Sequence, residues 1–139
     1  MREWRNEEFD FGIHPPAGAE GPFSVPENVT ALFFAQWIDA AGRRYFIQIL
    51  SGTIENFVLF NRDLIMAAGG AFIQDRAWGS TSGRAGWILE AQLPGGHSVD
   101  VVLERNGIVF NAGVADLTGA SSADLQVVTN FIDSLCADP

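Results

Sequence analysis

Alternating and continuous apolar runs divide the chain into three strands, one helix, four more strands and a closing helix. The runs that predict strands lie at residues 9–14, 29–38, 43–50, 71–78, 85–93, 97–105 and 108–115. Apolar residues at i, i+3 and i+4 spacing predict a helix from about 54 to 68 and another that begins at Ser121. This order favours an α+β fold, a twisted and mostly antiparallel sheet of about six to seven strands sandwiched by two main helices.

Local signals mark where the helices begin and end. Thr53 is a suitable N-cap for the first helix, and Gly69-Gly70 is a typical stop signal. Ser121 begins a Ser-Ser-Ala-Asp sequence that resembles a capping box with Asp124 in the place of glutamate. After the first strand, Pro15-Pro16 and the glycines and prolines that follow predict irregular chain up to about residue 28.

Two turns set the register of the central strands. Asn106-Gly107 is the preferred pair for a type I′ turn, and it places Leu103 opposite Phe110. Reading residues 94–96 as a three-residue loop also brings apolar face to apolar face, and it places Glu90 opposite Asp100. Like charges so placed are mildly destabilising, which favours an exposed position or a partner.

The strands at 29–38 and 43–50 are apolar on both faces, so that a helix, a second subunit or a ligand is expected on the second face. One face mixes amides with apolar side chains: Leu32, Phe34, Gln36, Phe46, Gln48 and Leu50. This mixed face is the candidate binding site, able to receive an apolar helix or a hydrophobic ligand. The alternative is that the helix at 54–68 or the N-terminal segment covers it.

The sequence also predicts an acidic face, on which Glu90, Asp100 and Glu104 lie together. Neighbouring carboxylates can carry out acid–base chemistry, bind a hard cation or meet an arginine-rich partner. Of these functions a basic partner is the simplest. The alternative is an ordinary solvated face of an antiparallel sheet.

Length and composition agree with one domain over residues 1–139, with residues 1–8 expected to form a flexible N-terminal segment. Hydrophobic residues make up 47% of the 139 residues and charged residues only 18%, so the chain can build a sizeable core. Eleven phenylalanines and four tryptophans make that core rich in aromatic side chains.

The formal net charge is −9, and all eight basic residues are arginines. Such a charge repels phosphate backbones and anionic lipid, which argues against nucleic acid and favours a basic partner. The single Cys136 excludes an intrachain disulfide. No run is long enough for a membrane span and the N-terminus has no apolar signal region, so a cytoplasmic protein is expected.

Candidate catalytic chemistry is sparse. His14 and His97 show no zinc-ligand spacing, and both are expected at strand ends or turns on the surface. No G-x-S-x-G sequence occurs, and the absence of lysine excludes a P-loop or Schiff-base lysine. We therefore assign no catalytic residue, no metal site and no cofactor from the sequence.

The chain resembles the superfamily that joins the PsbP-like proteins of photosynthetic membranes, the Mog-type Ran-binding proteins and small bacterial relatives. The resemblance lies in the opening Phe11-Gly12-Ile13-His14-Pro15-Pro16-Ala17-Gly18, the helix between two sets of strands, and the terminal helix from Ser121 to Leu135. It covers nearly the whole chain. Ala19 departs from the pattern, because an aromatic residue often follows Pro-x-Gly in the family.

Members of this superfamily mostly act by binding, as photosystem subunits, a Ran regulator, lipoproteins and chaperones for secreted effectors. The resemblance implies a non-enzymatic, protein-binding accessory or chaperone-like module, whose partner is another protein, either basic or with an exposed apolar helix. A homodimer is compatible with the sequence. Two alternatives stay open: a carrier of a small hydrophobic ligand, and a small hydrolase or isomerase on a curved sheet.

Overall fold

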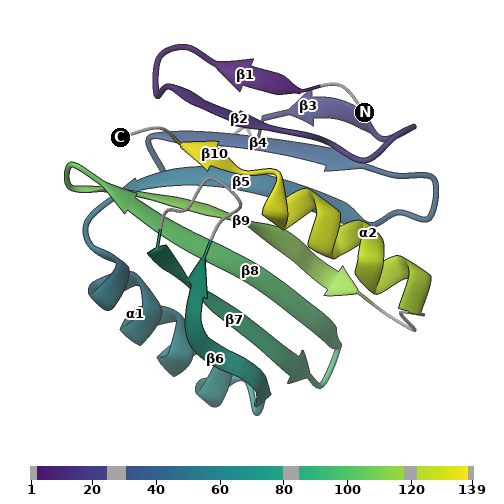
Figure 1. Ribbon diagram of the computed structural model, residues 1–139. Helices are drawn as coiled ribbons and strands as arrows, with labels where there is room; N and C mark the ends of the chain where they lie inside the picture. The colour runs from purple at the N-terminus through teal and green to yellow at the C-terminus, as the bar shows by residue number, and fades with distance from the viewer. Residues whose placement is uncertain (1–2, 25–30, 80–84, 118–121, 138–139) are drawn as a thin grey trace.

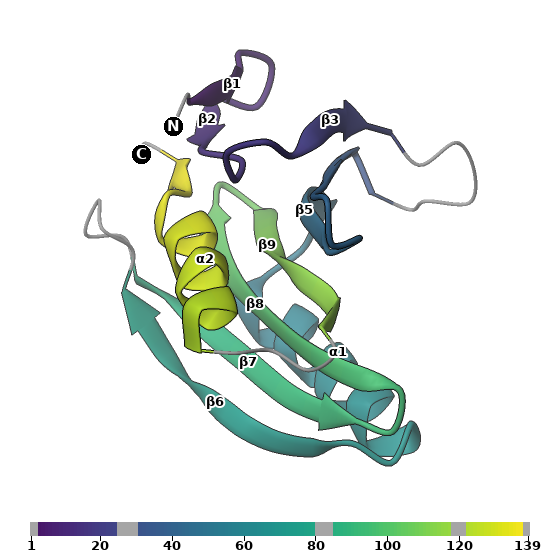
Figure 2. The ribbon, with the colours of Figure 1, turned by 90° about the vertical axis from the view of Figure 1, so that its right-hand side faces the viewer.

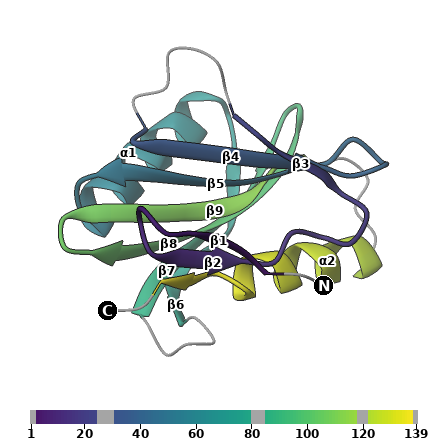
Figure 3. The same ribbon diagram turned by 90° about the horizontal axis from the view of Figure 1, so that it is seen from above.

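The computed structural model describes residues 3–24, 31–79, 85–117 and 122–137. Seven antiparallel strands form one sheet, with helix α1 (Ile54–Ala67) on one face and helix α2 (Ser122–Asp133) on the other (Figures 1 and 3). A second, three-stranded sheet lies on the α2 side. The predicted α+β class, the large antiparallel sheet and the two main helices are therefore confirmed.

The large sheet has the strand order β3-β4-β5-β9-β8-β7-β6. Its strands are β3 (Glu20–Phe23), β4 (Phe33–Ile38), β5 (Arg44–Ser51), β6 (Ala71–Gly79), β7 (Ala85–Leu93), β8 (Gly96–Arg105) and β9 (Ile108–Leu117). The small sheet has the order β1-β2-β10, with β1 (Trp4–Asn6), β2 (Phe11–Ile13) and β10 (Cys136–Ala137). Figure 2 shows the curvature of β6, β7 and β8 beneath α2.

The N-terminal part of the chain is more regular than the sequence predicts. Residues 1–8 were expected to be flexible, but Trp4–Asn6 form β1 and pair with β2. The centre of the Trp4 ring lies 5.4 Å from the centre of the Trp37 ring and 5.9 Å from that of the Phe33 ring. Aromatic contacts therefore fix this segment against the core. Likewise β3 lies within residues 15–28, which were expected to be irregular throughout.

The β8–β9 hairpin has the predicted register. Asn106 and Gly107 have φ values of 52° and 81°, the left-handed conformation that a type I′ turn needs at both positions. Leu103 accordingly lies opposite Phe110, and the apolar faces of the two strands match.

The β7–β8 hairpin differs from the prediction by one residue. Leu93 pairs with Gly96, so the loop has two residues, Pro94 and Gly95, instead of three. Glu90 consequently lies opposite Val99, while Asp100 lies opposite Leu89. Since a shift of one residue moves a side chain to the other face of a sheet, Glu90 and Asp100 are on opposite faces.

The core lies between the large sheet, α2 and the small sheet. Tyr45, Phe110 and Phe131 are fully buried there, with the Phe131 ring of α2 5.4 Å from the Tyr45 ring. Leu135, which follows α2, is fully buried as well. The predicted aromatic core is thus formed on the α2 side of the sheet.

Helix α1 begins and ends as the sequence predicts. Thr53 is the N-cap, and its hydroxyl accepts a hydrogen bond from the Asn56 amide. After Ala68, the Gly69 amide donates to the Met66 carbonyl and the Gly70 amide to the Ile65 carbonyl, which is the Schellman arrangement. Gly69 takes the left-handed φ of 79° that this ending needs. Of the residues in α1, only Val58 is fully buried.

Candidate functional site

The predicted mixed face lies on the α1 side of the large sheet. Strand pairing sets Phe34 beside Gln48 and Gln36 beside Phe46, so these four side chains share one face. Leu50 continues the same face along β5, and Leu32 lies just before β4 with 51% of its surface exposed. The fold therefore places five of the six predicted residues on one face of the sheet, with Leu32 immediately before that face in the chain.

Aromatic stacking organises this face. The rings of Phe34 and Phe46 lie 6.3 Å apart with an interplanar angle of 1°, and both residues are only partly buried. Helix α1 leaves them partly open because its contacts are with β7 and β8, further along the sheet. These two phenylalanines therefore keep part of their surface open to solvent.

A groove of about 470 Å³ runs between β5 and α1. From the sheet it is lined by Gln48 and Leu50, and from the helix by Asn56, Phe57, Phe60, Asn61 and Leu64. Phe60 and Leu64 are 64% and 52% exposed, so this groove is open to solvent. We call this surface, together with Phe34 and Phe46, the apolar groove.

Sequence reasoning missed the contribution of α1 to the groove. The i, i+3 and i+4 periodicity of residues 54–68 predicts one apolar stripe on the helix, which includes Phe57 and Leu64. A usable signal was present, because Leu59, Phe60 and Met66 are large apolar residues outside the stripe. An apolar surface wider than one stripe indicates more than one apolar contact for a helix.

A row of polar side chains crosses the sheet beneath this surface. Gln48 donates to the Asn111 Oδ1 at 2.8 Å, and the Asn111 Nδ2 donates to the Asp100 Oδ2 at 2.7 Å. Asn111 is only 2% exposed. Burial raises the pKa of Asp100 to about 7, although the hydrogen bond from Asn111 acts in the opposite direction. Asp100 can therefore change its charge near neutral pH.

The predicted acidic face does not exist as a unit of three residues. Asp100 and Glu104 share the α1 side of β8, but Glu90 lies on the α2 side. The Glu104 Oε1 accepts a hydrogen bond from the Ile54 amide at 2.8 Å, and so it receives one of the free amides at the start of α1. A common site for a cation or a basic partner on these three carboxylates is excluded by this arrangement.

Glu90 instead lines a cavity of about 370 Å³ between α2 and the sheet, whose walls carry both polar and apolar side chains. One Glu90 oxygen accepts from Gln74 at 2.6 Å, and the other lies 2.6 Å from the His97 Nε2. His97, predicted to lie on the surface, has a side chain only 16% exposed. His14, the second histidine, is partly exposed, and its Nε2 lies 3.8 Å from a Glu3 carboxylate oxygen.

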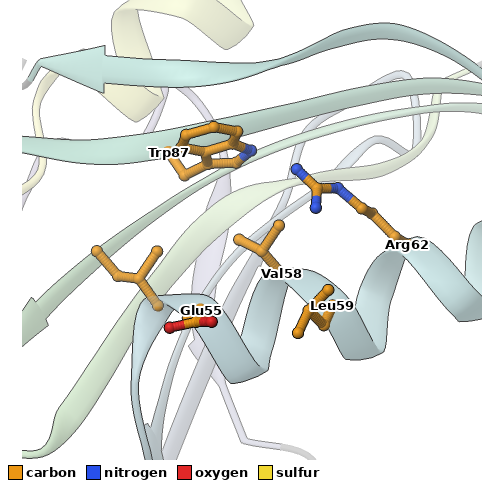
Figure 4. A pocket seen from close by; sticks show the side chains of 6 residues that line it. Glu55, Val58, Leu59, Arg62 and Trp87 are labelled. Atoms are coloured by element: carbon orange, nitrogen blue, oxygen red, sulfur yellow. The ribbon is translucent and has the colours of Figure 1, made fainter.

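A pocket of about 440 Å³ lies on the other side of α1 from the apolar groove (Figure 4). Its walls are Ile54, Glu55, Val58, Leu59, Arg62 and Trp87. Arg62 reaches from α1 towards the Trp87 ring, with its guanidinium carbon 5.7 Å from the ring centre. We call it the Trp87 pocket.

Asp75 of β6 connects the two sides of the Trp87 pocket. It accepts bonds from the Arg62 Nε at 2.6 Å, the Arg62 Nη2 at 2.7 Å and the Trp87 Nε1 at 2.6 Å. The Arg62 guanidinium lowers the pKa of Asp75, and the bond from Trp87 acts in the same direction. Asp75 therefore joins α1 to the edge of the sheet.

Within the described residues, no group of three histidine, cysteine or acidic side chains is placed to hold a metal ion. No helix in the same part of the chain is long and apolar enough to cross a membrane.

Comparison with known proteins gives a likeness of fold. No protein-family model and no curated protein sequence matches the chain. Among solved structures, the solution structure of cyanobacterial PsbP (CyanoP) from Synechocystis sp. PCC 6803 is similar with a TM-score of 0.74 and 12% identity, covering 99% of this chain and 92% of that one. A crystal structure from Bacteroides thetaiotaomicron VPI-5482 is similar with a TM-score of 0.50 and 10% identity. The match covers 99% of this chain and 48% of that one.

At these identities the likeness concerns the fold alone. The similarity to Mog-type Ran-binding proteins stays a prediction from the sequence. The comparison with cyanobacterial PsbP shows that the chain has a PsbP-like fold.

Proposed function

We propose that the protein is an accessory module that binds an apolar segment of another protein in the apolar groove. The observation that carries this proposal is the exposure of Phe60 and Leu64 in a groove whose sheet wall includes Gln48, the strand neighbour of Phe34 in the stacked Phe34–Phe46 pair. Large apolar side chains gathered in an open groove, on a chain that builds its core elsewhere, are typical of a protein–protein contact. The PsbP-like fold supports the proposal, since the resemblance implies a binding role.

The polar side chains of the groove favour a peptide as the occupant. Gln48, Asn56 and Asn61 line it, and all of its lining residues are uncharged. Amides can both donate to and accept from a peptide backbone, while the phenylalanines receive apolar side chains. With a net charge of −9 on the chain, basic residues flanking that apolar segment favour association.

The two alternatives have less support. A carrier of a small hydrophobic ligand needs an enclosed apolar cavity, whereas two residues that line this groove, Phe60 and Leu64, are more than half exposed. For an enzyme, Glu90 in the cavity beneath α2 is the best candidate base. Both of its oxygens already lie within hydrogen-bond distance of protein side chains, Gln74 and His97. A cytoplasmic location stays a prediction from the sequence.

Peptide selection tests the proposal directly. Displayed random peptides are selected on the immobilised wild-type protein, and the enriched peptides are then titrated against the wild type and the Phe60→Asp variant. We expect enrichment of peptides with clustered apolar residues and flanking lysine or arginine, and binding that shifts the side-chain amide NMR signals of Gln48 and Asn61. The matched control is Met66→Asp, on the opposite flank of α1, which should keep full affinity. Peptides that bind Phe60→Asp as well as the wild type contradict the groove as the site.

A further inference from the structure

Helix α1 has a second exposed apolar flank, which the apolar groove does not use. At 100° per residue, Glu55, Leu59, Arg62 and Met66 lie on one flank, and the groove residues Phe57, Phe60 and Leu64 lie on the other. Leu59 and Met66 are 49% and 66% exposed. We call this the Glu55–Met66 flank; it forms the α1 wall of the Trp87 pocket (Figure 4).

The two charged residues on this flank, Glu55 and Arg62, can pair with the same two residues of a second copy. Glu55 and Arg62 are seven residues apart, which separates them by about 10 Å along the axis of one helix. When a second copy of α1 packs antiparallel about a two-fold axis between residues 58 and 59, each Glu55 faces the Arg62 of the other copy. The exposed Leu59 side chains of the two copies then meet close to the axis. A two-fold interface needs this kind of self-complementary patch.

Arg62 has the donors that this arrangement requires. A guanidinium carries five N–H groups, and only the Nε and one Nη2 donor are used by Asp75. The remaining donors are available for a second carboxylate, and the Arg62 side chain is 32% exposed. The Glu55 side chain lies at the other end of the Trp87 pocket, towards the start of α1.

We propose that the protein forms a symmetric homodimer through the Glu55–Met66 flank, with Leu59 of each copy entering the Trp87 pocket of the other. The proposal goes beyond the binding of an apolar segment, because it concerns the opposite flank of α1 and leaves the apolar groove free in both copies. Helix α1 is only about 21 Å long, so the interface is at the small end of the range and the dimer dissociates at micromolar concentration.

Sedimentation equilibrium from about 1 to 500 µM tests the dimer. We expect the wild type to change from monomer to dimer in this range. Leu59→Asp should raise the dissociation constant by more than about thirtyfold, the size of a hot-spot loss. Phe60→Asp, one residue away but on the groove flank, should leave the constant unchanged. A wild type that stays monomeric at 500 µM, or a Leu59→Asp variant that dimerises normally, overturns the proposal.

Disulfide trapping tests the geometry independently of affinity. In a Cys136→Ala background, Leu59→Cys places one thiol of each copy near the two-fold axis, so oxidation should give a covalent dimer in high yield. Phe60→Cys is the matched control and should stay monomeric. Equal crosslinking of the two variants, or none of Leu59→Cys at concentrations where the wild type is dimeric, overturns the antiparallel arrangement of α1.

Discussion

The two helices cover opposite faces of one sheet, but they differ in how much of their apolar surface the sheet buries. In α2, Val128, Phe131 and Ile132 are at most 3% exposed, and they complete the aromatic core. In α1, Val58 alone is fully buried, while Leu59, Phe60, Leu64 and Met66 are between 49% and 66% exposed. Helix α2 therefore closes the core, whereas α1 presents apolar side chains to solvent on both of its flanks.

Truncation of one phenylalanine in each helix should give the largest contrast. Phe131→Ala removes a ring that is 1% exposed and contacts the rings of Tyr45 and Trp37, so unfolding should become easier by about 3–5 kcal/mol. Phe60→Ala removes a ring that is 64% exposed, and stability should change by no more than about 0.5 kcal/mol. Urea denaturation of both variants measures the difference. Equal losses would contradict the division between the two helices.

The polar row beneath the apolar groove should make stability depend on pH. The folded-state pKa of Asp100, about 7, lies above the value near 3.9 expected for an unfolded chain. The folded state therefore holds the proton more tightly. The contribution of Asp100 to the free energy of unfolding is therefore largest below about pH 4. It falls as pH rises towards 7 and is constant above that range.

Asp100→Asn keeps the side-chain shape and removes the charge. At pH 8 it should raise the free energy of unfolding by roughly 2–4 kcal/mol, and at pH 4 it should change little. Urea denaturation at both pH values checks this. A variant that is equally stabilised or destabilised at the two pH values would show that the pKa of Asp100 is not raised in the folded protein.

The Asp75→Asn variant tests whether the hydrogen bonds of Asp75 hold α1 against the sheet. Asp75→Asn removes the charge that Arg62 and Trp87 share, and stability at pH 7 should fall by about 1–3 kcal/mol. Because the pKa of Asp75 is lowered in the folded state, the loss should disappear as pH falls below about 4. Amide hydrogen exchange should show faster opening of α1 with α2 unchanged. Uniform acceleration of both helices would argue against a local role.

The smallest effect is expected at the outer end of α1. Met66 is 66% exposed, so Met66→Ala should leave the thermal unfolding midpoint within about 2 °C of the wild type. If the proposed dimer forms, the same variant should weaken it measurably. A clear loss of monomer stability would show that the Glu55–Met66 flank already has a partner within its own chain.

Turn chemistry explains how much of the sheet could be predicted. Asn106-Gly107 admits one tight turn, so the register of β8 and β9 followed from the sequence. Residues 94–96 include two adjacent glycines, which are compatible with either a two- or a three-residue loop. The structure has the two-residue loop, which places Glu90 on the opposite face from Asp100. The prediction of a common acidic face is wrong for that reason.

The candidate site was predicted in its sheet half only. Alternation along β4 and β5 was enough to place Phe34, Gln36, Phe46 and Gln48 on one face. The position of α1 over β7 and β8 depends on long-range contacts with Glu104 and Asp75, which no local pattern in the helix encodes. Short strands such as β1, with three residues, carry too little alternation to be recognised.

The hydrogen bonds of α1 have a consequence for how tightly it can bind. Glu104 fixes the first turn of the helix and Asp75 fixes Arg62 two turns later, so the helix is anchored at two points before any partner arrives. Immobilising a flexible side chain or loop on association costs affinity. Since α1 is already in place, little conformational entropy remains to be lost on this side of a complex, and even a small contact area can give useful affinity.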